Sequence, residues 1–140
     1  MNDQFNLIRF LQVQDEMYSV ALDELKKGRK RSHWMWYIFP QLKGLGHSYN
    51  ANYYGISGTE EASEYLANPI LGQRLRELSN AILNLATDDA VEIFGDIDSY
   101  KLRSSMTLFD LISPNDIFAR VLDKYFDGQR DNRTVNLIQP

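Results

Sequence analysis

The sequence predicts an all-α fold: a compact single domain of about six or seven helices, with one buried aromatic segment and little or no sheet. Apolar residues recur three and four positions apart along most of the chain, which is typical of helices with one buried face. The clearest stripe consists of Leu71, Leu75, Leu78, Ile82 and Leu85. A length of 140 residues and a hydrophobic fraction of 44% suit one domain with one core, spanning residues 1–140.

The first third of the chain is predicted to form a long helix followed by an irregular apolar segment. Residues 5–27 carry a helical apolar pattern, in which Asp15 is a candidate cap for a second half after a break. Residues 34–39 are six consecutive apolar residues with no polar face, so we expect them to be largely buried. Residues 52–56 are a candidate short extended piece.

The remaining two thirds are predicted to be helices separated by capping residues. Ser57 to Glu60 has the pattern of a capping box, and Gly95 is expected to end one helix before another begins. The other candidate caps, each followed by a helical pattern, are Asn68, Asp88 or Asp89, Asp98, Ser113 to Asp116, and Asp131.

The composition excludes several classes of function. The chain has no cysteine, so a disulfide scaffold, a thiolate zinc site and a cysteine nucleophile are excluded. Its two histidines have no paired carboxylate spacing, and we expect no metal and no cofactor. No signal peptide or membrane-spanning apolar run is present, which predicts a cytoplasmic protein without membrane association. A net charge of −4 disfavours binding to duplex nucleic acid, and we expect a monomer or a weak homodimer.

The main candidate for a functional segment is residues 28–42. Five cations lie within residues 26–31, and His33, Trp34 and Trp36 follow them. Such cations bind phosphate or carboxylate, aromatic faces stack on bases or sugars, and histidine changes protonation near neutral pH. A structural interpretation competes with this one: the aromatic residues would form the core, and the basic residues a solvated helix end. For the aromatic run the core interpretation is favoured.

A second candidate segment is residues 101–109. Helical geometry places Lys101, Ser104, Ser105 and Leu108 on one side of a helix. Two adjacent serines are unfavourable inside a helix, which is expected where a site is built or where helices pack closely; close packing is favoured. A serine nucleophile would need an adjacent base, and His33 could serve only if the fold brings the two together.

These strings resemble a known family. Residues 28–42, Gly44-Leu45-Gly46 with Ser48, Tyr54-Gly55-Ile56 and residues 101–109 are similar to the bacterial family called domain of unknown function 1810. The resemblance extends over nearly the whole chain and implies a compact, mainly α-helical domain without an established activity, so no catalytic residue is carried over. The calpastatin-like label that some members receive does not suit this chain, because calpain inhibitors are long, disordered and proline-rich. The matched positions include Lys30, His33, Trp34, Trp36, Gln41, Lys101, Ser104 and Ser105.

Three functions remain open from the sequence. The first is a binding module or enzyme for a small anionic ligand, either a nucleotide or a phosphorylated or ADP-ribose-like metabolite. The second is a protein-interaction module whose basic turn docks an acidic partner. The third is a hydrolase with His33 as general base, for which Asp15 is the one candidate orienting acid. For the first, both segments would meet at one polar pocket with His33, and the ligand-binding residues would be Lys30, Arg31, Trp34, Trp36, Gln41, Lys101, Ser104 and Ser105.

Overall fold

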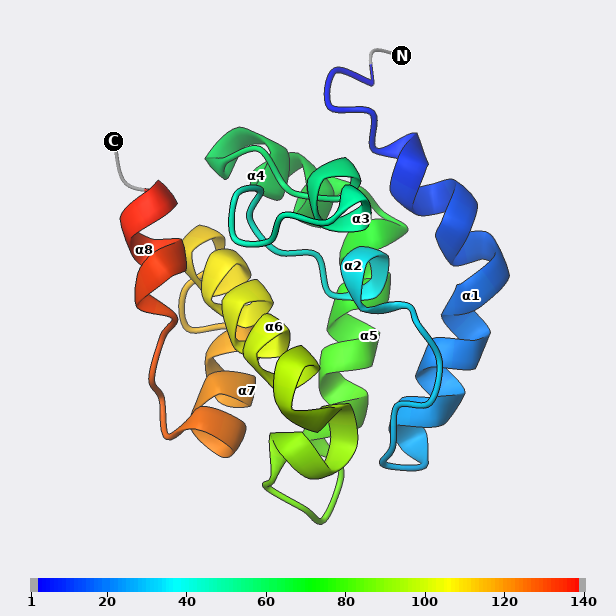
Figure 1. Cartoon of the computed structure of the whole chain (residues 1–140), viewed down its shortest axis with the longest axis vertical. Helices are drawn as coiled ribbons and strands as arrows, with labels where there is room; N and C mark the ends of the chain where they lie inside the picture. Colours follow the sequence, from blue (N-terminus) through cyan, green and yellow to red (C-terminus); the bar gives the residue numbers. More distant parts are fainter. Residues whose placement is uncertain (1–2, 139–140) are drawn as a thin grey trace.

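The computed structural model describes residues 3–138, and this part of the chain forms eight helices and no strand (Figure 1). The predicted all-α class is therefore confirmed. An isolated parallel bridge joins Leu42 and Ile56. No helix between residues 3 and 138 has both the length and the apolar character needed to cross a membrane. The helices are α1 (Ile8–Lys26), α2 (Met35–Ile38), α3 (Tyr49–Tyr53), α4 (Thr59–Ala67), α5 (Leu71–Leu83), α6 (Ala90–Ile112), α7 (Ile117–Phe126) and α8 (Asn132–Ile138).

The helices form one core around α5 and α6. Helix α5 packs against α1, α4 and α7, while α6 packs against α4, α7 and α8. In Figure 1, α1 and α8 lie at opposite sides of the molecule, and the short helices α2 and α3 lie between α1 and the long ribbon of α6. The connection between α2 and α3 crosses the same region of this view, and its residues 43–48 are exposed or half-buried.

Helix α1 is continuous, so the predicted break near Asp15 is wrong. Asp15 lies inside the helix and pairs with Arg74 of α5 at 3.2 Å instead of capping a second half. The adjacent Gln14 is buried and donates a hydrogen bond to the carbonyl of Tyr37 at 2.7 Å. Both polar residues thus have partners on other elements, and nothing locally interrupts the backbone.

The segment before α4 also differs from its prediction. Residues 49–53 are helical, because the Ser48 hydroxyl caps α3 by accepting from the Ala51 backbone N–H at 3.1 Å. The predicted extended piece over residues 52–56 is therefore wrong, apart from the single bridge at Ile56.

The predicted capping box at Ser57 does not form, and a buried ion pair occupies its place. Glu61 accepts from the Ser57 backbone N–H at 2.8 Å, and its other oxygen pairs with Arg9 of α1 at 2.7 Å. The Arg9 guanidinium also donates to the Tyr53 carbonyl at 2.8 Å. These contacts hold α1 against the connection between α3 and α4.

Helix α6 bends at Gly95, as the sequence predicts. Asp89 caps its first part by accepting from the Val91 backbone N–H at 3.0 Å. Gly95 has φ 82° and ψ 171°, a conformation that glycine adopts more readily than other residues. Asp98 was expected to cap the second part, but its carboxylate pairs with two lysine side chains instead.

The aromatic segment is buried, as the sequence predicts. Trp36 is half-buried, and the buried members are Trp34, Met35, Tyr37, Ile38 and Phe39. The Trp34 and Phe39 rings both pack edge-on against Phe94 of α6, at centroid distances of 6.4 and 5.9 Å. The segment thereby fixes the path of the chain from α1 into the loop that follows α2.

We predict that Leu75→Ala lowers the free energy of unfolding by roughly 2–5 kcal/mol, because this core side chain is only 1% exposed and its removal leaves a cavity. Urea denaturation would measure the loss. Gln73→Ala, on the exposed side of the same helix, serves as the control and is expected to change stability little. Equal effects of the two substitutions would contradict the packing of α5.

Candidate functional site

The basic turn, defined as residues 26–31, is held in place by the Glu24 carboxylate of α1. Glu24 accepts hydrogen bonds from the Arg31 backbone N–H at 2.8 Å, the Ser32 hydroxyl at 2.6 Å and the Trp34 indole N–H at 2.9 Å. Burial opposes ionisation of Glu24, but these hydrogen bonds outweigh it and hold its pKa at about 2. Sequence reasoning missed Glu24, because a glutamate on a helix surface carries no signal of partners further along the chain.

Lys30 points into the protein. Its side chain is 10% exposed and pairs with Asp98 of α6 at 2.9 Å, and its ammonium nitrogen lies 5.1 Å from the centroid of the Trp34 ring. The second oxygen of Asp98 lies 3.7 Å from the ammonium nitrogen of Lys101. Asp98 therefore joins the two segments that the sequence singles out, a role that its expected position as a helix cap did not reveal.

The other predicted residues of the first segment fall in different environments. Trp34 is fully buried, with Lys30 over its ring, so its face is not accessible to a ligand here. His33 and Arg31 are exposed, and within residues 3–138 the His33 imidazole makes no hydrogen bond. Ser105, from the second segment, is fully buried, and its hydroxyl has no partner in the described part of the chain.

Three of the predicted residues, Gln41, Lys101 and Ser104, line one groove of about 430 Å³, which we call the cationic groove. Its walls come from the loop after α2, the middle of α6 and the beginning of α8. Lys101, Arg103 and Arg133 contribute positive charge, and Asp131 contributes one negative charge. His33 does not line this groove, so the two segments share it without the histidine. The other lining residues are Leu45, Gly46, Ile97 and Tyr100.

Arg103 is an unpaired cation in the cationic groove. Its guanidinium makes no ion pair and no hydrogen bond with any residue between 3 and 138, and its Nε atom is buried. A buried donor without an acceptor costs about 1–3 kcal/mol. Arg103 also borders a neighbouring hollow that contains Asp96, yet no carboxylate there approaches within ion-pair distance. The sequence signal for Arg103 was its place within residues 101–109, but it lies off the helix face we selected.

Ser104 belongs to a hydrogen-bond network that fastens α8 to α6. Its hydroxyl donates to Oδ2 of Asp131 at 2.8 Å, and the Thr134 hydroxyl donates to the same oxygen at 2.6 Å. Burial opposes ionisation of Asp131, but the hydrogen bonds from Thr134 and Ser104 outweigh it and keep the pKa of Asp131 below its usual range. Ser104 therefore has a carboxylate, and not His33, as its neighbour.

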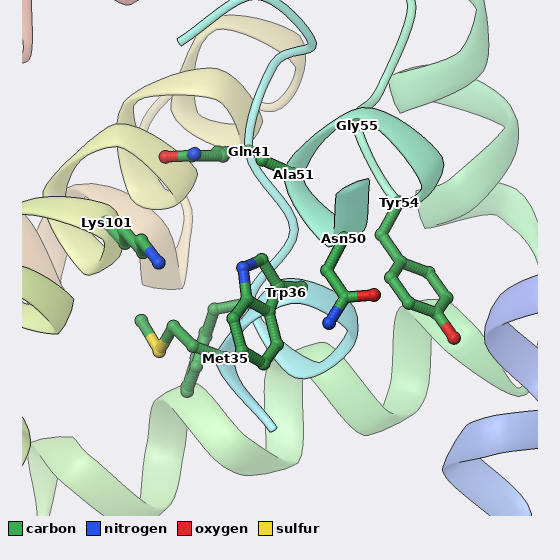
Figure 2. A pocket seen from close by; sticks show the side chains of 9 residues that line it. Met35, Trp36, Gln41, Asn50, Ala51, Tyr54, Gly55 and Lys101 are labelled. Atoms are coloured by element: carbon green, nitrogen blue, oxygen red, sulfur yellow. The ribbon is translucent and has the colours of Figure 1, made fainter. Parts of the chain in front are cut away.

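A smaller slot beside Trp36 adjoins the cationic groove and shares Gln41 and Lys101 with it (Figure 2). Its free volume is about 10 Å³, enough for about one water molecule. The Lys101 ammonium lies 5.1 Å from the centroid of the Trp36 ring, in a cation–π contact. Figure 2 shows the indole nitrogen of Trp36 on the side that faces Lys101. The slot is therefore closed to an aromatic ligand while Lys101 keeps this position.

Comparison with known proteins gives a family and a close structural neighbour. The model of a family described as "Protein of unknown function (DUF1810)" matches residues 4–138. A solved structure, the conserved hypothetical protein Rv1873 from Mycobacterium tuberculosis, is 47% identical and superimposes with a TM-score of 0.95. The alignment covers 97% of this chain and 98% of that one. A search of curated proteins finds no match. These findings support the helical fold and bring no activity with them.

We predict that Glu24→Gln destabilises the protein near neutral pH and that its deficit relative to the wild type shrinks as the pH falls toward 2. The pKa of Glu24 lies below its ordinary value of 4.5 in the folded protein, so the carboxylate stabilises the fold above that value and loses this effect as it is protonated. Denaturation at several pH values would measure this. Glu16→Gln, on the exposed surface of α1, is the control; a deficit independent of pH would contradict the role of Glu24.

Proposed function

This chain belongs to the DUF1810 family of proteins of unknown function, and we propose that it binds a small anionic ligand in the cationic groove. The ligand class is a nucleotide or a phosphorylated or ADP-ribose-like metabolite. The observation that carries the proposal is the guanidinium of Arg103, which lines the groove and makes no hydrogen bond or ion pair within residues 3–138.

The chemistry of the groove supports an anion with several oxygen acceptors. Phosphate oxygens would accept from the terminal N–H groups of Arg103, which have no acceptor among the described residues, and guanidinium groups bind phosphate through paired N–H donors. Arg133 is exposed, and its guanidinium donates to the Leu45 carbonyl at 3.3 Å, which leaves other N–H groups free for a ligand. A volume of about 430 Å³ lies within the usual range of small-molecule sites, roughly 300–1,000 Å³.

Lys101 connects this groove to the aromatic slot. Its contact with Asp98 is long, 3.7 Å, while the same carboxylate keeps Lys30 at 2.9 Å. A phosphate in the groove would compete with Asp98 for the Lys101 ammonium at little cost, because Asp98 would remain paired. Movement of Lys101 would uncover the Trp36 ring, on which a base could stack. Trp36, and not the buried Trp34, is therefore the stacking residue of the proposal.

The proposed site modifies the set of residues expected from the sequence. Four of the expected residues remain in the proposed site: Gln41, Lys101, Ser104 and Trp36. Arg103 and Arg133 take the charge-neutralising role that was expected of Lys30 and Arg31. Ser104 positions Asp131 in this site, and Ser105 lies in the core.

The two alternative functions receive different support. Exposed Arg29 and Arg31 on the basic turn favour the protein-interaction module as a second candidate. The hydrolase has no such support, because Asp15 pairs with Arg74 and the His33 imidazole has no orienting hydrogen bond within residues 3–138.

We predict that ADP and pyrophosphate raise the melting temperature of the wild-type protein, since a ligand that binds only the folded state stabilises it. Arg103→Ala should weaken binding roughly tenfold or more, because it removes a charge-assisted hydrogen bond of about 1.5–3 kcal/mol. Arg31→Ala, the same change on the exposed basic turn, should leave binding unchanged. Circular dichroism would verify the fold of both variants.

Two results would overturn this proposal. One is the absence of any thermal shift with nucleotides, pyrophosphate and phosphorylated sugars. The other is a loss of binding in Arg31→Ala that equals the loss in Arg103→Ala, which would locate anion binding at the basic turn and favour an acidic partner.

We further predict no tight binding to duplex DNA at physiological salt. The groove cations line a concave site, and the chain as a whole carries a net charge of −4, so few phosphates of a duplex could be neutralised at once. A mobility-shift assay would test this, and a submicromolar complex that resists added salt would refute it.

A further inference from the structure

We infer that Asp131 makes the cationic groove selective for phosphates that carry hydroxyl groups, such as sugar phosphates and nucleotides, over phosphates without them. This inference rests on the proposed function and narrows its ligand class. It comes from one feature of the groove: a fixed carboxylate oxygen without a protein donor.

The hydrogen bonds to Asp131 are all made to one of its two oxygens. Oδ2 accepts from the Ser104 hydroxyl at 2.8 Å, the Thr134 hydroxyl at 2.6 Å and the Thr134 backbone N–H at 3.3 Å. Within residues 3–138, Oδ1 accepts none. The residue is only 9% exposed, yet it lines the cationic groove. The structural role of Asp131 at the start of α8 therefore uses Oδ2 and leaves Oδ1 available.

The position of Asp131 is fixed by its backbone as well as by its side chain. Its backbone N–H donates to the Thr107 hydroxyl at 2.9 Å, and that hydroxyl donates to the Arg103 carbonyl at 2.7 Å. Asp131 is thus held against the backbone of Arg103 at the wall of the groove. A ligand would therefore meet a fixed carboxylate acceptor beside the Arg103 side chain, whose guanidinium lies 5.8 Å from the centroid of the Tyr100 ring.

The Asp131 carboxylate and the Arg103 guanidinium bind different groups of a ligand, because their charges are opposite. An ionised carboxylate only accepts hydrogen bonds, and the pKa of Asp131 below its usual range keeps it ionised at neutral pH. It repels a phosphate oxygen but accepts readily from a hydroxyl, as acidic residues do from ribose hydroxyls in dinucleotide sites. Arg103 and Arg133 would take the phosphate. The positive charge of Arg103 contributes to the lowered pKa of Asp131, but neither arginine forms an ion pair with this carboxylate in the described residues.

The wild-type protein tests this with two phosphate monoesters, of which only one carries free hydroxyl groups. Ribose 5-phosphate and methyl phosphate are both phosphate monoesters, but methyl phosphate has no alcohol group. In a calorimetric titration, ribose 5-phosphate should bind at least roughly tenfold more tightly than methyl phosphate. This is the effect expected of one hydrogen bond to a charged group. Pyrophosphate and ADP serve as probes of anion binding itself.

A single substitution should reverse this preference. Asp131→Asn keeps one oxygen to accept from Ser104 and Thr134 and turns an amide N–H₂ toward the groove. This variant should bind methyl phosphate as well as or better than the wild type, because the repulsion is gone, and ribose 5-phosphate more weakly. Such opposite changes in the two affinities cannot arise from partial unfolding, because partial unfolding weakens the binding of both ligands. Asp96→Asn, in the hollow on the other side of Arg103, removes the same charge and should leave the ratio unchanged.

The outcomes separate the two proposals. Equal affinity of the wild type for ribose 5-phosphate and methyl phosphate would overturn the inference and leave anion binding in the groove intact. An unchanged ratio in a folded Asp131→Asn variant would also overturn it. Failure of pyrophosphate, ADP and both monoesters to bind would overturn the proposed function, and this inference with it.

Discussion

The bridge from Lys30 through Asp98 to Lys101 is the contact on which the arrangement of the site depends. It joins the turn after α1 to the second part of α6, so it fixes where the aromatic segment enters the core and where the groove begins. Because Lys30 is largely buried, loss of Asp98 would leave a charge without a partner, which is far more costly than loss of an exposed ion pair. The bend at Gly95 lies three residues before Asp98 on α6 and sets the direction of this part of the helix.

Other carboxylates in the fold also join elements that are separate in the sequence. The Glu24 carboxylate accepts hydrogen bonds from the turn that follows α1. Glu61 pairs with Arg9, which also contacts α3, and Asp131 connects α8 to α6 by a hydrogen bond. In each case an acidic side chain on one element satisfies polar groups of another. Short helices such as α2, α3 and α8 have little stability of their own, so tertiary contacts of this kind hold them in place.

This use of carboxylates changes the meaning of the positive charges. The dense basic turn is the obvious feature of the sequence, yet its Lys30 is paired and largely buried, and Glu24 holds the Arg31 backbone. Arg103 lies outside that basic turn, yet its guanidinium makes no ion pair and no hydrogen bond in the described chain. Whether a cation is available to a ligand thus depends on which acid the fold places beside it.

The sequence by itself determined the helical class, the positions of the long helices and the burial of residues 34–39. These features depend on periodicity, capping and runs of apolar residues, which act over a few positions of the chain. It also marked the two segments that meet at the groove.

Only the tertiary structure decided which of their side chains face that groove. His33 lies outside it, Trp34 and Ser105 lie in the core, and Arg103 and Asp131 line it. The physical reason is that burial and charge pairing are set by partners distant in the chain, as Asp98 is from Lys30, and no local pattern encodes such a partner.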